Sequence, residues 1–364
     1  MLVGGATEQT RWHIARVGAR HLLQSFETWR AAGEPLVLAT VYETAGSTYS
    51  KAGHRILLAA NGDYRGLVSG GCLEGDLAER ARGVIAAGRA AAVTYDLRDS
   101  ADDLWGLGVG CNGLLRVFLQ PLLPANGYEP FAAIAERLAA TRTAGLATVI
   151  ESDRPELMVG ATAVVAETTE RVFGADDGAA AALRSAARSS MQSGAARLAI
   201  EQGCRILCAP LYPIPRLLVL GGGLDAIPLV GMADELGWFV TVADHRPGYL
   251  ARGGFERAER VVLVEPGKLA AALRLGDFDA IVVMSHHLAT DRKYLAELAA
   301  VDARYLGVLG PRARRDRLLA ELADAAPQLE QRLKGPVGLD IGADSPESIA
   351  LSILAELQST LSTR

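Results

Sequence analysis

A glycine-rich turn is the clearest sign of chemistry in the sequence. The apolar run Leu217–Leu220 leads into Gly221-Gly222-Gly223-Leu224-Asp225-Ala226, which fits the pattern G-x-G-x-x-A between a strand and a helix. In this pattern Gly221 permits the tight turn, Gly223 lets the backbone approach a pyrophosphate, and Ala226 allows close packing of helix on strand. Because free backbone N–H groups at a helix start attract anions, the turn predicts a site for a phosphate-bearing ligand.

The residues after the next apolar run bear on the identity of that ligand. Asp244 stands 23 positions after Gly221, where an acidic residue binds ribose hydroxyls in dinucleotide-binding domains. His245 and Arg246 follow it and are able to meet a phosphate, so NAD and NADP both stay open. The alternative is a Rossmann-like fold that has lost its nucleotide, since Asp225 places a negative charge where a pyrophosphate would lie.

Two cysteines stand in glycine-rich settings and offer soft sulfur ligands. Cys72 follows Gly70 and Gly71, and a helix beginning at Cys72 would place its thiol at the positive end of the helix dipole, which favours the thiolate. Cys111 lies within the glycine-rich segment 107–113. We expect the two cysteines to ligate molybdenum or to carry sulfur; the alternatives are a small buried residue and a tight structural turn. No CxxC pattern or nearby histidine completes a zinc site.

Polar residues follow two further apolar runs near the C-terminus. Ser285, His286 and His287 come directly after 280–284, and Gly310–Arg315 follows 305–309. Ligands of open α/β sheets bind outside the carboxyl ends of the strands, so these loops are well placed. Either histidine is a candidate acid or base, Ser285 a candidate cofactor contact, and Arg312 a candidate phosphate clamp. The alternatives are solvated loop histidines and an ordinary basic helix start.

The elements that must position these residues alternate regularly after Pro215. Apolar strand-like runs cover 217–220, 239–243, 260–264, 280–284 and 305–309, and helical segments cover 226–236, 266–274, 291–300, 312–323 and 346–361. Apolar strands that alternate with helices indicate a parallel sheet covered on both faces. The predicted fold class is therefore α/β, with a C-terminal Rossmann-like parallel-sheet domain after an N-terminal mixed α+β region.

The N-terminal half has a less regular order of elements. Helices are expected over 12–32, 72–87, 130–141 and 179–191, and strands over 36–42, 55–60, 64–68, 93–97, 114–120, 147–151, 157–166 and 205–209. Asn61-Gly62 between two apolar runs predicts a hairpin. Two proline-bearing stretches, 121–130 and 210–215, place boundaries near residues 125 and 213. We expect domains over 1–125, 126–213 and 214–364, with the first two able to share one mixed sheet.

Composition excludes several classes of protein. The chain has 364 residues, half of them apolar, and a formal net charge of −5 without a long basic run, so nucleic-acid binding is not expected. Four cysteines do not make a disulfide framework, and Cys204 and Cys208, four positions apart, are expected in the core. The sequence has no apolar run of about 18 residues, so no membrane span is expected. Basic residues interrupt any signal-peptide core near the N-terminus, so we expect a cytoplasmic protein.

Taken together, these segments resemble the XdhC/CoxI family, the accessory proteins of xanthine dehydrogenase and carbon monoxide dehydrogenase. The resemblance covers nearly the whole chain and rests on an ordered set of motifs that are weak one by one. In the N-terminal half it is carried by Gly46-Ser47-Thr48, Lys51-Ala52-Gly53, Arg55, Gly70–Glu74 and the 108–113 loop. In the C-terminal part it is carried by Gly221–Ala226, Asp244–Pro247, Ser285-His286, Gly307–Arg312, Gly335–Ala343 and Pro346-Glu347.

The resemblance implies a role in the maturation of molybdenum hydroxylases. It implies that the protein binds the molybdenum–pterin cofactor transiently, protects it while its sulfido ligand is installed, and delivers it to the apoenzyme. The implied partners are a xanthine dehydrogenase-like molybdoenzyme and a cysteine desulfurase. Cys72 and Cys111 match the family cysteines by position. One hypothesis therefore places the phosphate of the cofactor at Gly221–Ala226 and its metal near Cys72 and Cys111, across the domain interface.

Three interpretations of function stand beside one another. The first is a cofactor chaperone with little or no turnover. The second is an NAD(P)-dependent oxidoreductase with His286 or His287 as proton donor, and the third is a scaffold that binds only partner proteins. The first is favoured because the N-terminal part shows no convincing second carrier for a dehydrogenase reaction. A homodimer is expected, since a shared surface would help to shield a labile cofactor.

Overall fold

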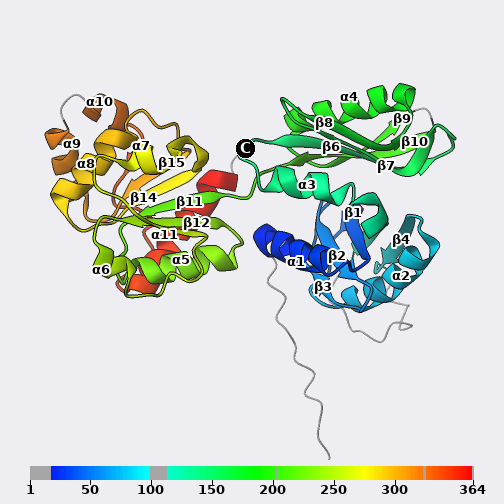
Figure 1. Cartoon of the computed structure of the whole chain (residues 1–364), viewed down its shortest axis with the longest axis horizontal. Helices are drawn as coiled ribbons and strands as arrows, with labels where there is room; N and C mark the ends of the chain where they lie inside the picture. The colour runs from blue at the N-terminus through cyan, green and yellow to red at the C-terminus, as the bar shows by residue number, and fades with distance from the viewer. Residues whose placement is uncertain (1–17, 99–112, 202, 323–324, 363–364) are drawn as a thin grey trace, which may run out of the picture.

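The computed structural model describes residues 18–98, 113–201, 203–322 and 325–362. Within these ranges the chain forms three β-sheets: two of five antiparallel strands in the N-terminal half and one of six parallel strands after residue 215. Figure 1 shows the parallel sheet and its helices on one side of the molecule and the two antiparallel sheets on the other. The α/β fold class predicted from the sequence is confirmed.

The first sheet has the strand order β3-β2-β1-β5-β4. Val37, Ala39 and Val41 alternate along β1 toward helix α2, while Leu36 and Leu38 face the side covered by α1 and α3. The predicted hairpin around Asn61-Gly62 is confirmed, because β2 and β3 pair antiparallel across that turn. The elements are α1 (Ala19–Ala31), β1 (Leu36–Gly46), β2 (Arg55–Ala59), β3 (Tyr64–Arg65), α2 (Glu74–Ala87), β4 (Ala91–Asp96), β5 (Gly113–Leu122), the 3-10 helix η2 (Pro124–Asn126) and α3 (Phe131–Leu138).

The second sheet has the order β8-β7-β6-β10-β9, with α4 packed on one face. Its elements are β6 (Ala144–Ser152), β7 (Leu157–Val165), β8 (Glu170–Ala175), α4 (Asp177–Ser193), β9 (Arg197–Glu201) and β10 (Cys204–Leu211). The two antiparallel sheets are separate, so the shared mixed sheet that the sequence left open for the segments before and after residue 125 does not form. They meet through a large apolar cluster in which α3 packs against residues of both sheets, and through a smaller contact of Tyr42 and Phe118 with Ile150 and Leu207.

The third sheet has the order β13-β12-β11-β14-β15-β16, and every neighbouring pair is parallel. Leu217 and Val219 face α5 and α11, whereas Leu218 and Leu220 face α8 and α9, so both faces are covered as predicted. The elements are β11 (Arg216–Leu220), α5 (Ala226–Glu235), β12 (Phe239–Asp244), α6 (Pro247–Leu250), β13 (Arg260–Leu263), α7 (Leu269–Ala272), the 3-10 helix η3 (Leu275–Asp277), β14 (Ala280–Val283), α8 (Leu288–Leu298), β15 (Tyr305–Val308), α9 (Arg312–Glu321), α10 (Ala326–Leu329), β16 (Leu333–Lys334) and α11 (Pro346–Ser362).

The amino ends of the parallel strands face the N-terminal half of the molecule. Arg216, which opens β11, donates from Nη2 to the carbonyl of Ala139 at 2.7 Å. Arg20 on α1 donates from Nη1 to the carbonyl of Trp238, just before β12, at 3.2 Å. Since the strands are parallel, their carboxyl ends lie at the opposite edge of the sheet. This arrangement gives no support within one chain to the hypothesis that places the phosphate at Gly221–Ala226 and the metal near Cys72 and Cys111 across the domain interface, and the site residues stay predictions.

Candidate functional site

The glycine turn joins β11 to α5 beside the point where the strand order reverses. Because β11 lies between β12 and β14, the loops after β11 and β14 flank this topological switch point, where open α/β sheets bind ligands. Gly221 has φ +137°, and a Cβ there would lie 2.4 Å from the carbonyl oxygen of Met284. The turn thus passes so close to the end of β14 that only glycine fits. Helix α5 begins at Ala226, as the motif predicts.

Asp244, at the end of β12, is fully buried and holds the glycine turn through the backbone of Gly222. Its Oδ1 accepts from the backbone N–H and Nε of Arg246 at 2.8 and 2.9 Å, and its Oδ2 accepts from the backbone N–H of Gly222 and from Nη2 of Arg246, both at 2.7 Å. Burial raises the pKa of Asp244, but the hydrogen bonds from Arg246 and Gly222 outweigh it and hold the pKa below its ordinary value.

A carboxylate offers about four acceptor positions, and all four of Asp244 are in use. The ribose contact expected of this residue from its place in the sequence is therefore not available in this geometry. Asp244 instead fixes the backbone of Gly222 and the side chain of Arg246. Any part that it plays in ligand binding is indirect.

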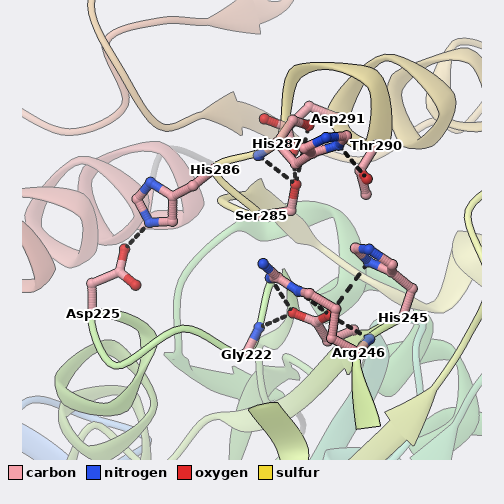
Figure 2. Close-up of polar contacts among 10 residues, drawn as sticks. Gly222, Asp225, His245, Arg246, Ser285, His286, His287, Thr290 and Asp291 are labelled. Carbon is pink, nitrogen blue, oxygen red and sulfur yellow. Dashed lines mark hydrogen bonds and ion pairs between the residues drawn. The ribbon is translucent and has the colours of Figure 1, made fainter. Parts of the chain in front are cut away.

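Asp225 and His286 form a pair that connects the two loops beside the switch point. Nε2 of His286 lies 2.7 Å from Oδ2 of Asp225, which links the loop after β14 to the glycine turn (Figure 2). His286 has a left-handed backbone with φ +61°, a conformation that costs energy for a residue with a side chain and is concentrated at functional sites. An anion at the start of α5 must face the Asp225 carboxylate, whose charge a protonated His286 would balance.

A buried network holds the loop that carries His286. The hydroxyl of Ser285, only 1% exposed, donates to Oδ1 of Asp291 at 2.5 Å and accepts from the backbone N–H of His287 at 3.3 Å. Arg314 completes the network by donating from Nη2 to Oδ2 of Asp291 at 2.7 Å. Ser285 is thus turned into the protein, and its predicted role as a cofactor contact would fall to its backbone.

The other two residues predicted at this edge differ in exposure. Nδ1 of His287 lies 3.0 Å from the hydroxyl of Thr290, and His287 precedes the first residue of α8. Arg312 opens α9 with its side chain 80% exposed, and its Nε lies 3.9 Å from the carboxylate of Asp316. Arg312 is therefore accessible, whereas Arg314, which the sequence motif contains without a predicted role, is the arginine that ties α9 to the switch-point loops.

Cys72 lies in an exposed loop between β3 and α2. Gly70 and Gly71 have φ +77° and +113°, so the loop has a backbone that other residues adopt rarely. The helix begins at Glu74, two residues later than expected, and Cys72 therefore precedes the helix rather than opening it. The expected start of the helix at Cys72 is therefore two residues too early.

Glu74 shapes the cysteine loop, a positioning role that the sequence reasoning missed. Its buried carboxylate accepts from the backbone N–H groups of Val68 at 2.7 Å, Ser69 at 2.9 Å and Gly71 at 3.0 Å, and from the Ser69 hydroxyl at 2.6 Å. Burial raises the pKa of Glu74, but these hydrogen bonds outweigh it and leave the pKa below its ordinary value. The carboxylate is therefore ionised at neutral pH and holds the loop from inside.

The remaining cysteines fall into two groups. Cys204 and Cys208 are buried in the core between α4 and the second sheet, as predicted. Cys111 and the rest of the 108–112 segment lie outside the described residues, so the predicted second cysteine contact stays a prediction. Across the described ranges no cluster of three or more His, Cys, Asp or Glu side chains is arranged to hold a metal ion. No helix in the same ranges is long and apolar enough to cross a membrane.

Fold and site together define a class of protein: a Rossmann-like domain with a glycine turn at its switch point, joined to an N-terminal half that presents an exposed cysteine loop. Comparison with known families agrees, because residues 217–357 match the model of the XdhC Rossmann domain and residues 29–96 match that of the XdhC and CoxI family. The chain belongs to the XdhC and CoxI family, and the resemblance noted in the sequence is confirmed.

Individual relatives extend over nearly the full length. The chain is 29% identical to a Bacillus subtilis (strain 168) protein whose name describes it as a probable xanthine dehydrogenase subunit, over 90% of this chain and 93% of that one. It is 22% identical to the molybdenum cofactor insertion chaperone PaoD of Escherichia coli (strain K12), over 90% of this chain and 84% of that one. A crystal structure from Bacillus halodurans, described as a xanthine dehydrogenase, superposes with a TM-score of 0.74 at 28% identity, over 94% and 96% of the two chains.

Proposed function

We propose that this chain is an accessory protein for molybdenum hydroxylase maturation. It binds the molybdenum–pterin cofactor, assists its sulfuration and delivers it to a xanthine dehydrogenase-like apoenzyme. The observation that carries the proposal is similarity along 90% of the chain to two proteins, one named as part of a xanthine dehydrogenase and the other as a molybdenum cofactor insertion chaperone. By the same reasoning we propose a cysteine desulfurase as second partner, a homodimer, and a cytoplasmic location.

The geometry of the described residues fits a transient guest better than a resident metal. The sulfur atoms of the pterin hold the molybdenum, so the protein does not need a cluster of ligands of its own, and none is arranged in the described ranges. Cys72 is exposed on a loop whose backbone is fixed by Glu74, which suits a sulfur atom that meets a guest and releases it. Gly221, Gly223 and Ala226 are the proposed contacts to the phosphate end, with Ser285 and Arg312 at the same edge. Because this edge lies opposite the N-terminal half of its own chain, a guest that meets both the turn and a cysteine loop is proposed to do so between the two chains of the homodimer.

An NAD(P)-dependent oxidoreductase is the second candidate, because the Rossmann strand order is complete and His286 is exposed beside the glycine turn. Its weakness is Asp244, whose acceptor positions are all occupied. The two candidates differ in what the purified protein retains. A pterin that fluoresces after acid oxidation supports the chaperone, whereas bound nicotinamide together with steady-state turnover supports the enzyme.

The decisive experiment is mass spectrometry of the ligand released from full-length protein made in a molybdenum-replete host. We expect a pterin in the wild type and a several-fold lower content in Cys72→Ala. Cys208→Ala, which removes a buried thiol from the core, is the matched control and should keep the wild-type content. A wild-type protein that retains no pterin contradicts the proposed function. A Cys72→Ala variant that retains as much pterin as wild type contradicts the contact between Cys72 and the cofactor.

A further inference from the structure

The carboxyl end of β12 carries a cationic group that the glycine turn does not use. Arg246 donates to Asp244 through Nε and Nη2, at 2.9 and 2.7 Å. Its third nitrogen, Nη1, has no acceptor among the described residues, and the side chain is 26% exposed. Figure 2 shows the guanidinium directed toward the loop of Ser285 to His287, that is, toward the switch point. One edge of Arg246 is therefore anchored and another is available to a ligand.

The surroundings hold Arg246 rigidly and bring a second arginine close to it. Cζ of Arg246 lies 3.7 Å from the centre of the Tyr249 ring on α6, and Cζ of Arg252 lies 5.1 Å from the same ring. A guanidinium held between a bidentate carboxylate and an aromatic face loses little conformational entropy when it binds an anion. Asp244 holds one edge of Arg246, and a second arginine, Arg252, lies against the same ring.

Tyr294 supplies an independent sign of a missing polar group. This residue of α8 is fully buried, and its hydroxyl has no hydrogen-bond partner in the part of the chain that the structure describes. It packs in the same apolar cluster as Ala243, the residue before Asp244, on the face of the sheet that α8 covers. Buried hydroxyls without a partner are rare and mark places where an ordered water or a ligand oxygen completes the bonding.

We propose that Arg246, anchored by Asp244 and stacked on Tyr249, is an anion subsite that takes a phosphate monoester of the ligand bound at the switch point. The inference rests on the proposed ligand-binding function and narrows the class of ligand. A ribose with free hydroxyls finds no acceptor at Asp244, whereas a phosphate dianion meets the free edge of Arg246. Such a phosphate belongs either to a phosphorylated pterin or to the 2′-phosphate of a dinucleotide, and the two sources give different results below.

The first arm of the test compares NADP+ and NAD+, which differ only in the 2′-phosphate. Full-length protein from a molybdenum-depleted host is titrated with each by calorimetry. If the subsite takes a nucleotide phosphate, wild type binds NADP+ at least tenfold more tightly, and the preference falls below twofold in Arg246→Gln. Arg246→Lys keeps a positive charge beside Asp244, so that variant stays folded while losing the bidentate fork and most of the preference. Arg292→Gln, on the exposed side of α8, is the control and keeps the preference.

The second arm measures pterin retained by the same variants from a molybdenum-replete host. If the phosphate belongs to the pterin, its content falls at least fivefold in Arg246→Gln and Arg246→Lys but not in Arg292→Gln, while the two nucleotides bind alike. Equal binding of both nucleotides together with unchanged pterin content overturns the subsite. A wild type that prefers NADP+ but retains no pterin supports the subsite and contradicts the chaperone function. A wild type that binds neither nucleotide and retains no pterin contradicts both.

Discussion

At the scale of single residues, one buried carboxylate determines the shape of the loop that presents Cys72. Glu74 accepts four hydrogen bonds from three residues of that loop, and hydrogen bonds to a charged group contribute about 1.5–3 kcal/mol each when a partner is removed. Glutamine has nearly the same size but places an N–H₂ group where one carboxylate oxygen accepts. The loop donors at that end then face another donor.

We therefore expect Glu74→Gln to lower the free energy of unfolding by about 2 kcal/mol, and to change the rate at which a thiol reagent modifies Cys72. Urea unfolding and the modification rate measure the two effects. Glu79→Gln, on the exposed face of the same helix, is the matched control and should resemble wild type in both. If Glu74→Gln also unfolds and reacts like wild type, the carboxylate does not organise the loop.

Asp225 is the residue at the glycine turn that opposes an anion. Its carboxylate lies at the start of α5, beside His286, where a phosphate would benefit from the free N–H groups. Replacing one nearby charge in a partly exposed site changes binding by about 1 kcal/mol, or about fivefold. Asp225→Asn should therefore bind NADP+ about fivefold more tightly than wild type does in calorimetric titration. The control is Asp302→Asn, at the amino edge of the sheet, which should bind with the wild-type affinity. If Asp225→Asn also binds with the wild-type affinity, the phosphate does not reach the turn.

At the scale of elements, two loops depend on ionised carboxylates. Glu74 holds the loop before α2 and Asp244 holds the end of β12, and the pKa of each lies below its ordinary value in the folded state. A group with a lowered folded pKa contributes stability that is fully present above its ordinary pKa and is lost as pH falls through the folded pKa. Acid should therefore weaken both loops, beginning below the ordinary carboxyl values of 4.5 and 3.8.

Urea unfolding of wild type between about pH 6 and pH 3 should accordingly show a falling free energy of unfolding. Glu74→Gln lacks one of the carboxylates whose pKa is lowered in the folded state, so its free energy of unfolding should fall less over the same interval, and the two curves should converge toward acid. Parallel curves would mean that Glu74 has the same pKa folded and unfolded. Glu79→Gln again supplies the control, since its side chain is exposed at 72% in the folded protein.

Most elements were predictable from the sequence because their patterns are local. The apolar runs at Leu217–Leu220 and the Asn61-Gly62 turn carry their own periodicity and turn chemistry, and both appear as expected. The short strands β8, β9 and β16 were missed, because their pairing partners rather than their own composition make them strands.

The candidate site was predictable only in part, for a related reason. Residue types and spacing placed the glycine turn, His286 and Arg312 at one edge of the sheet, where the structure has them. The hydrogen bonds of Glu74, Asp244 and Arg314 depend on how loops fold back on these side chains, which spacing does not encode. The sequence therefore located the edge of the sheet that carries the site, but not the hydrogen bonds that hold its loops in place.

At the scale of the whole molecule, the relation between the two halves depends on a close approach of two backbones. Gly18, just before α1, packs against Gly237 in the turn between α5 and β12, and a Cβ on Gly18 would lie 2.4 Å from the Cα of Gly237. Next to this contact, Arg20 donates from Nη1 to Asp234 at 3.1 Å and to the carbonyl of Trp238. The helix that opens the described chain is thereby attached to the amino edge of the Rossmann sheet.

Gly18→Ala tests whether this contact couples the two halves. The added methyl group cannot fit against Gly237, so α1 must move outward and lengthen the hydrogen bonds of Arg20, at a cost of about 1–3 kcal/mol. We expect calorimetry to show a lower melting temperature and a single transition that broadens or separates into two, because the halves then unfold independently. Gly75→Ala, on α2 with no atom within 4 Å of its added Cβ, should melt at or above the wild-type temperature. A Gly18→Ala variant that melts in one sharp transition at the wild-type temperature would mean that α1 is not what holds the Rossmann domain to the N-terminal half.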